Sequence, residues 1–213
     1  DYAQSIAEMI TLENGSSINF NKALQEQVIP IVNNSIFEDA EQFDWETERD
    51  NWDGSKVLVV REPVGVVAAI VPWNAPQQSA LGKVIPALVA GNSVILKPTP
   101  ETAIDAMALG DIFNEAGLPK GVLSILPADR EVSAYLTSVP AVDKIAFTGS
   151  TGAGIAIAQI AGAQMKRFTL ELGGKSAGII LDDATPEQIV STVLMRSLVN
   201  NGQVCIGLTR LLV

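Results

Sequence analysis

The chain has 213 residues, of which 47% are apolar and 18% are charged, and its formal net charge is −10 at pH 7. This balance supports a packed core and excludes disorder, while the negative charge disfavours nucleic acid and anionic membranes as partners. Histidine is absent and Cys205 is the single cysteine. The composition therefore excludes an internal disulfide and histidine-based catalysis within these residues, and we expect a reducing, cytoplasmic location and no metal ion.

The first part of the chain predicts helices followed by strands. Residues 1–38 carry apolar positions at spacings of three and four, which is typical of helices, and residues 38–54 are acidic and aromatic, which predicts a solvated loop or the entry to a hairpin. Residues 56–73 then predict a strand, a turn and a second strand. The longest apolar runs are too short or too interrupted to span a bilayer. Because the chain opens without Met in a helical pattern and closes on TRLLV, we expect it to be a fragment of a longer protein.

From residue 66 onward, short apolar runs alternate with helical segments. Strands are predicted at 66–71, 93–97, 122–126, 143–148, 167–172 and 177–181, and helices at 76–90, 101–116, 130–138, 152–163 and after residue 186. Strands that alternate with helices of this length form a parallel sheet covered on both faces. The sequence therefore predicts an α/β fold with a doubly wound parallel sheet.

Polar residues follow several of these strands at the point where each strand ends. Ligands bind at the carboxyl ends of the strands in a doubly wound sheet. Lys97 closes one strand and could reach a ribose or a phosphate, and the turn GSTGAG (149–154) opens a helix whose backbone N–H groups could hold a phosphate. Each feature also fits a purely structural role, as a solvated lysine or a glycine-rich turn.

Three further residues carry groups that are suited to acyl chemistry. Asn74 in PWNAP could donate to a developing oxyanion, Glu171 in LELGGK could act as a general base, and Cys205 in GQVC could be a nucleophile. On these residues alone, the alternatives of a turn asparagine, a salt-bridged glutamate (paired with Lys175) and a buried packing cysteine stay open.

In order and spacing, the segments PWNAP, VILKP, FTGSTGAG, LELGGK and GQVC resemble the NAD(P)-dependent aldehyde dehydrogenase superfamily, and the resemblance runs from about residue 8 to the end of the chain. It implies that Cys205 attacks an aldehyde to give a thiohemiacetal, while Asn74 and the backbone N–H of Cys205 hold the oxyanion. Hydride transfer to the nicotinamide leaves a thioester, which water activated by Glu171 hydrolyses. The cofactor contacts that the resemblance implies are Ile70, Pro72, Trp73, Lys97, Gly149, Ser150, Thr151, Gly154 and Leu172.

The resemblance also implies a domain organisation and partners. Residues 1–44 and 64–172 would form the cofactor-binding domain, 45–63 a hairpin for oligomerisation, and 173–213 the N-terminal part of an incomplete α/β catalytic domain. The implied partners are a small-molecule aldehyde and further copies of the chain, as a homodimer or homotetramer of the full-length form, without nucleic acid or membrane.

Two positions depart from the pattern of the superfamily. Many members have a ribose-binding glutamate where this chain has Pro100, with Glu101 one residue later. NAD is the expected cofactor, and the missing carboxylate predicts that NADP is tolerated as well. Residues 125–133 lack the glycines that many members carry after the equivalent strand, and Asp129 near a pyrophosphate would be unfavourable unless its carboxylate points to solvent.

Two alternatives to a hydrolytic aldehyde dehydrogenase stay open from the sequence. A coenzyme-A-acylating semialdehyde dehydrogenase shares the fold and the cysteine, but such enzymes usually lack the base in LELGGK, so Glu171 favours hydrolysis. The other alternative is an inactive, truncated nucleotide-binding fragment. The motifs do not identify the aldehyde.

Overall fold

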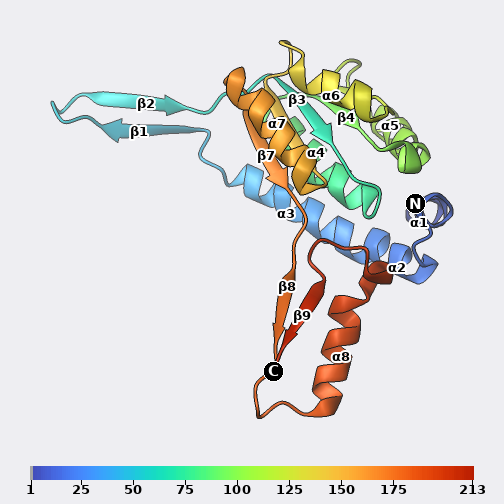
Figure 1. Cartoon of the computed structure of the whole chain (residues 1–213). Helices are drawn as coiled ribbons and strands as arrows, with labels where there is room; N and C mark the ends of the chain where they lie inside the picture. Colours follow the sequence, from blue (N-terminus) through green and yellow to red (C-terminus); the bar gives the residue numbers. More distant parts are fainter. Residues whose placement is uncertain (1) are drawn as a thin grey trace.

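A computed structural model describes residues 2–213 (Figure 1). The chain begins with four helical segments, which are α1 (Ala3–Asn14), α2 (Ile18–Ala23), the π-helical turn η1 (Leu24–Val28) and α3 (Ile29–Glu41). Gly15 ends α1 with a φ of 75°, and the Ser17 hydroxyl caps α2 by accepting from the backbone N–H of Phe20. The predicted helices are confirmed, but α3 extends to Glu41, into the predicted loop. Its last residues, EDAE, are acidic yet compatible with a helix, so their charge was a poor indicator of a loop.

An antiparallel ribbon, which we call the arm, projects away from the rest of the molecule (Figure 1). It consists of β1 (Glu46–Asp50) and β2 (Lys56–Val60), paired in register from Glu46↔Val60 to Asp50↔Lys56. At its base the rings of Phe43 and Trp45 pack edge-on with centroids 4.8 Å apart. The strand predicted at residue 56 therefore pairs with the acidic segment before it.

A five-stranded parallel sheet forms the centre of the molecule, in the order β5-β4-β3-β6-β7. Its strands are β3 (Val66–Ile70), β4 (Ser93–Lys97), β5 (Leu123–Ile125), β6 (Lys144–Thr148) and β7 (Arg167–Glu171). The connecting helices are α4 (Pro76–Val89), the 3-10 turn η2 (Pro100–Thr102), α5 (Ala103–Glu115), α6 (Arg130–Ser138) and α7 (Thr151–Ala163). The predicted doubly wound α/β fold is confirmed.

The two faces of the sheet are covered by separate apolar clusters. Along β3 the side chains alternate between them, since Val67 and Ala69 belong to the cluster beneath α4 while Ala68 and Ile70 belong to the cluster beneath α7. All four residues are buried. A strand buried on both faces reads as a continuous apolar run, and this is why VVAAI was recognisable in the sequence.

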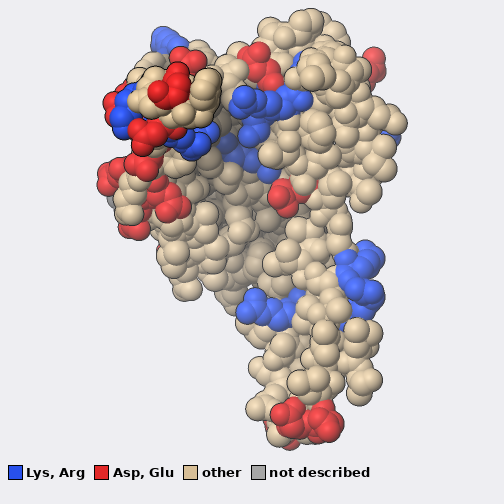
Figure 2. Space-filling view, turned by 90° about the vertical axis from the view of Figure 1, so that its left-hand side faces the viewer, with Lys and Arg blue, Asp and Glu red and all other residues tan. Residues whose placement is uncertain are grey.

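After β7 the chain leaves the central sheet and forms a separate group of elements (Figure 1). These are β8 (Ser176–Ile179), α8 (Pro186–Ser197), the 3-10 turn η3 (Val199–Gly202) and β9 (Leu208–Leu212), with β8 and β9 paired in parallel. None of the residues of α8 is buried. Figure 2 shows a largely uncharged surface on this part, between its upper end and the acidic tip.

None of the helices within residues 2–213 combines the length and the apolar character that a membrane crossing requires.

Candidate active site

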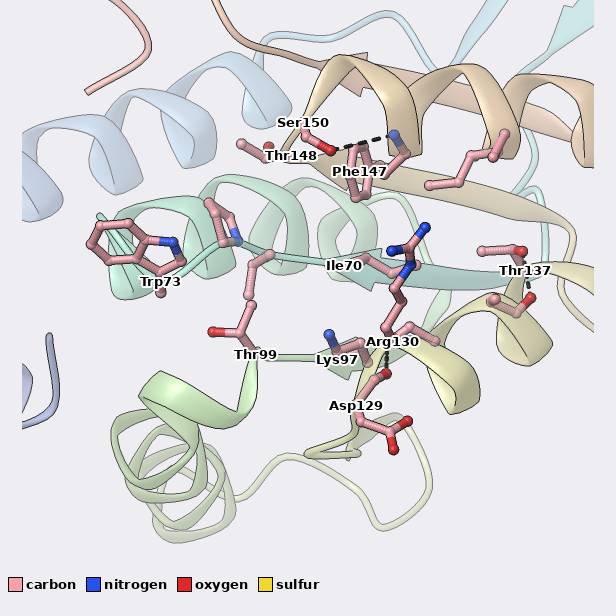
Figure 3. Close-up of a pocket in the computed structure, with 18 of the residues that line it drawn as sticks. Ile70, Trp73, Lys97, Thr99, Asp129, Arg130, Thr137, Phe147, Thr148 and Ser150 are labelled. Atoms are coloured by element: carbon pink, nitrogen blue, oxygen red, sulfur yellow. Dashed lines mark hydrogen bonds between the residues drawn. The ribbon is translucent and has the colours of Figure 1, made fainter. Parts of the chain in front are cut away.

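A cavity of about 630 Å³ lies at the carboxyl ends of β3, β4 and β6 (Figure 3). In the sheet β3 pairs with β4 on one side and with β6 on the other, so the strand order reverses direction here. Such a switch point is where doubly wound sheets bind ligands. The cavity is bounded by the end of β3, by the β4–η2 connection, by α6, and by the β6–α7 turn with the first half of α7.

Lys97 is the last residue of β4 and is only 5% exposed. Figure 3 shows its ammonium group directed into the cavity. Burial lowers the pKa of Lys97, while the nearby carboxylates of Glu101 and Asp129 act in the opposite direction. A partly desolvated cation gains free energy from a hydroxyl or phosphate ligand, so this position suits the role expected from the sequence.

The turn between β6 and α7 provides the opposite wall. Ser150 caps α7 by accepting from the backbone N–H of Ala153 at 3.3 Å, and Gly149 and Ser150 both line the cavity. Thr151 and Gly154 line neither this cavity nor the smaller one beside it. A methyl group on Gly154 would lie 2.6 Å from Cδ2 of Leu172, so this glycine permits close packing of α7 against the chain after β7.

A second cavity of about 330 Å³ adjoins the first. Pro72, Trp73 and the segment 148–150 line both of them. Asn74, Leu172 and Cys205 line only the smaller one. The fold therefore brings Asn74 and Cys205 to the lining of one cavity, although they lie far apart in the chain, and this cavity adjoins the larger one.

Asn74 is engaged with the loop that precedes the cysteine. Its Nδ2 donates to the carbonyl of Gln203 at 2.7 Å, and Nδ2 of Asn200 donates to the carbonyl of Asn74 at 2.8 Å. Asn200 and Asn201 both adopt left-handed backbone angles, with φ of 51° and 57°. These contacts hold the loop in place, while Cys205 remains exposed.

Glu171 ends β7 at the same edge of the sheet, but it does not line the cavity that contains Cys205. Its backbone carbonyl accepts from the N–H of Gly149 at 2.9 Å, which ties it to the β6–α7 turn. Its side chain is exposed, and its charge acts on Lys83 of α4. Burial lowers the pKa of Lys83, and the Glu171 carboxylate opposes this shift.

Helix α6 supplies wall residues that the sequence analysis did not identify. Arg130, Ser133, Ala134 and Thr137 recur at helical spacing and all line the larger cavity. In Figure 3 the Arg130 side chain extends across the cavity. The spacing was visible in the sequence, but only the packing of α6 beside α7 shows which face is turned inward.

Asp129 also lines the larger cavity, and one of its carboxylate oxygens caps α6 by accepting from the N–H of Val132 at 3.0 Å. The carboxylate is thus engaged at the start of the helix, as is common for aspartate. Within residues 2–213, no group of three or more His, Cys, Asp or Glu side chains is placed to hold a metal ion.

Comparison with known proteins identifies the family. The family model described as the aldehyde dehydrogenase family matches residues 1–213. The chain belongs to the aldehyde dehydrogenase family. This confirms the resemblance that the motifs suggested.

Individual members of the aldehyde dehydrogenase family are similar over most of the chain. A geranial dehydrogenase of Castellaniella defragrans is 43% identical over 209 residues, which are 98% of this chain and 44% of that protein. A vanillin dehydrogenase of an Amycolatopsis species is 49% identical over 154 residues, 72% of this chain and 32% of that protein. The structure of a Mycobacterium tuberculosis aldehyde dehydrogenase complexed with NAD+ matches with a TM-score of 0.94 and 37% identity, covering 99% of this chain and 43% of that one. The chain thus spans less than half the length of these relatives.

Proposed function

We propose that the full-length protein oxidises an aldehyde to a carboxylic acid with NAD(P)+. One observation carries this proposal. Asn74 and Cys205 meet in a small cavity that opens onto a larger one at the switch point of the sheet. Family membership and the dehydrogenase relatives support the same reaction class.

The residues present fit a dinucleotide. The larger cavity has a volume within the usual range for cofactor sites. Lys97 would bind the ribose of the adenosine half, and Ser150 with the N–H groups at the start of α7 would hold the pyrophosphate. Ile70, Pro72 and Trp73 line the groove, and Leu172 would contact the nicotinamide, which accepts the hydride when it is bound. Support for either form of the cofactor comes from relatives whose structures are complexes with NAD+ and with NAP.

The residues of this chain would perform two steps, the addition of a thiolate to the aldehyde and the later hydrolysis of the thioester. The Cys205 thiolate forms a C–S bond to the carbonyl carbon, and the oxyanion that results accepts hydrogen bonds from the Asn74 amide and the Cys205 N–H. Departure of hydride from that carbon leaves a thioester. Glu171 takes a proton from water, the hydroxide adds to the thioester carbon, the C–S bond breaks, and the carboxylic acid leaves. Glu171 is exposed at the end of β7, and this role requires its side chain to turn toward the thioester.

The assembly of the protein is also a proposal. Residues 1–44 and 64–172 would act as the cofactor-binding domain, 45–63 as the hairpin for oligomerisation in a homodimer or homotetramer, and 173–213 as the start of the catalytic domain. The projection of the arm and the departure of the chain after β7 support this division. We further propose a cytoplasmic location, because the exposed thiol of Cys205 must stay reduced to react.

The proposal is tested by activity of the full-length protein on a panel of aldehydes. Geranial, vanillin and betaine aldehyde are included because relatives are named for them, with NAD+ and NADP+ each tried. We expect Cys205→Ala to abolish turnover and Glu171→Gln to release one equivalent of NAD(P)H per site before turnover stops. Stoichiometric alkylation of Cys205 by iodoacetamide should be slowed by the preferred aldehyde.

Two results would contradict the proposal. Cys205→Ala with activity unchanged would show that the sulfur is not the nucleophile. Cofactor binding without turnover of any aldehyde would favour the inactive nucleotide-binding alternative. A coenzyme-A requirement for turnover would instead favour the acylating reaction, against which Glu171 argues.

A further inference from the structure

The helices α6 and α7 face each other across the larger cavity. The inward face of α6 consists of Arg130, Ser133, Ala134 and Thr137, and the wall opposite includes Ala153, Ala156, Ile157 and Ile160 of α7. The small side chains of Ser133, Ala134, Ala153 and Ala156 leave a slot between the helices, and its width depends on the separation of α6 and α7.

Helix α6 has little apolar burial to hold it in place. Only Leu136 and Thr137 of its nine residues are buried, and both lie in its last turn. In its first turns, Val132 and Tyr135 are exposed, at 43% and 71%. The position of α6 therefore depends on the contacts at its C-terminal end.

At that end two side chains bind three consecutive backbone carbonyls. Nζ of Lys166 donates to the carbonyl of Thr137 at 3.1 Å and to that of Val139 at 2.5 Å. Nε2 of Gln164 donates to the carbonyl of Ser138 at 3.3 Å. The last carbonyls of a helix lack partners within it, and a cation there also interacts favourably with the helix dipole.

The two donors belong to the turn that connects α7 with β7. Between them Met165 has a left-handed φ of 54° and is 91% exposed, so its side chain contributes little packing. Backbone N–H groups of residues 164–166 bond back to the carbonyls of Ala161 and Gly162, which fixes the turn to the end of α7. The clamp formed by Gln164 and Lys166 thus links the end of α7 to the end of α6.

We propose that Lys166, assisted by Gln164, is a positioning residue for the cofactor, which sets the separation of α6 and α7 and thereby the affinity of the slot for the adenosine half of the dinucleotide. This inference rests on the proposed function. Lys166 touches neither cavity, so its effect on binding acts through the helix carbonyls that it holds.

The test measures binding of AMP, which can occupy only the adenosine half, by calorimetry on the full-length protein. Replacing Lys166 with Met keeps the aliphatic stem and removes the charged donor. We expect Lys166→Met to raise the Kd of AMP and the KM of NAD(P)+ by up to about ten-fold, because the free energy of one charge-assisted hydrogen bond limits what a displaced helix can cost binding. The KM for the aldehyde and kcat at saturating cofactor should stay unchanged, and Lys166→Arg should restore binding.

Lys120→Met is the matched control, because Lys120 is exposed and lies outside both cavities. Wild type that binds AMP while folded Lys166→Met binds it equally well would overturn this inference and leave the proposed function standing. Wild type that binds neither AMP nor NAD(P)+ would overturn both. If Lys166→Met fails to fold, Gln164→Leu decides, with a rise of about three-fold in the Kd of AMP expected for a neutral hydrogen bond and an unchanged Kd overturning the inference.

Discussion

Asp105 is a carboxylate buried at the start of α5, where it is 1% exposed. Nε2 of Gln77 donates to its Oδ2 at 3.0 Å, and both oxygens of Glu13 accept from the first backbone N–H groups of α5. Burial, and then the Glu13 charge, raise the pKa of Asp105 from its ordinary value of 3.8 to about 7. Between about pH 4 and pH 7, Asp105 therefore carries a proton in the folded protein that it has lost in the unfolded chain.

This difference in proton binding sets the sign of the pH dependence of stability. Because the folded state binds more protons than the unfolded state between about pH 4 and pH 7, the Asp105 contribution to stability falls as pH rises through this window and is level above it. The full shift corresponds to about 4 kcal/mol at most. We expect Asp105→Asn to raise the free energy of unfolding relative to wild type more at pH 8 than at pH 5, measured by urea denaturation. An equal effect at both pH values would show that Asp105 is ionised throughout.

Glu101 is the residue that we expect to affect the choice between NAD and NADP. It lines the larger cavity, and its charge raises the pKa of Lys97 against the effect of burial. A 2′-phosphate near this carboxylate would be repelled, so the tolerance of NADP expected from Pro100 is opposed by its neighbour. We predict that Glu101→Gln raises kcat/KM for NADP about ten-fold and changes that for NAD less than three-fold.

The control for this prediction is Glu131→Gln, since Glu131 is exposed on α6 and does not line the cavity. An NADP/NAD ratio that moves equally in both variants would mean that only the net charge matters. A wild-type enzyme that uses NAD alone would contradict the tolerance attributed to Pro100.

At the scale of elements, Gly154 and Gly162 of helix α7 distinguish the effect of side-chain packing from the effect of helix propensity. A methyl group at Gly154 would meet the side chain of Leu172, whereas one at Gly162 would meet nothing within 4 Å. Gly162→Ala should therefore stabilise the protein by up to about 1 kcal/mol, as alanine generally does in helices. Gly154→Ala should push Leu172 toward the smaller cavity and lower kcat/KM about ten-fold, because small misplacements at a reacting centre are costly.

Thermal unfolding and initial rates on the two variants check this prediction. If Gly154→Ala is as active as Gly162→Ala, then Leu172 can shift without disturbing the site. Such a result would weaken the assignment of Leu172 to the nicotinamide contact.

The elements themselves were largely predictable, since strands such as SVILK are continuous apolar runs bounded by glycines and polar residues. Lys97 could be identified from its place at the end of a strand, and Cys205 from its place in the motif GQVC. The clamp on α6 could not be predicted, because Lys166 binds carbonyls through tertiary packing that leaves no pattern in the sequence. The bond from Asn74 to Gln203 could not be predicted either, since it joins residues 129 positions apart in the chain.

At the scale of the whole molecule, the two parts differ in how much apolar surface they bury. The central sheet is covered on both faces, whereas α8 has no buried residue and exposes Val190, Leu194 and Met195. An exposed apolar face of this kind marks a surface that packs against something else. We attribute it to packing against other parts of the full-length protein.

The arm also exposes apolar side chains. It is a two-stranded ribbon, which is marginally stable alone in water, and its strand β2 exposes Val57, Leu58 and Val60. Adjacent side chains on a strand point to opposite faces, so Val57→Lys with Leu58→Lys places a charge on both faces of the ribbon. We predict that this double variant lowers the oligomer mass of the full-length protein, measured by size-exclusion chromatography with light scattering, because a buried lysine cannot be accommodated at an apolar contact.

The matched control adds two charges elsewhere, as Asn114→Lys with Gln159→Lys, at exposed helical positions outside the arm. This control should keep the wild-type mass, and both variants should keep the wild-type Kd for AMP, since no residue of β1 or β2 lines the larger cavity. An unchanged mass in the arm variant would assign the arm to contacts within one chain. A lower mass together with lost AMP binding would instead mean that the arm supports the fold of the cofactor-binding domain, because an arm that serves only assembly leaves the affinity of the cavity unchanged.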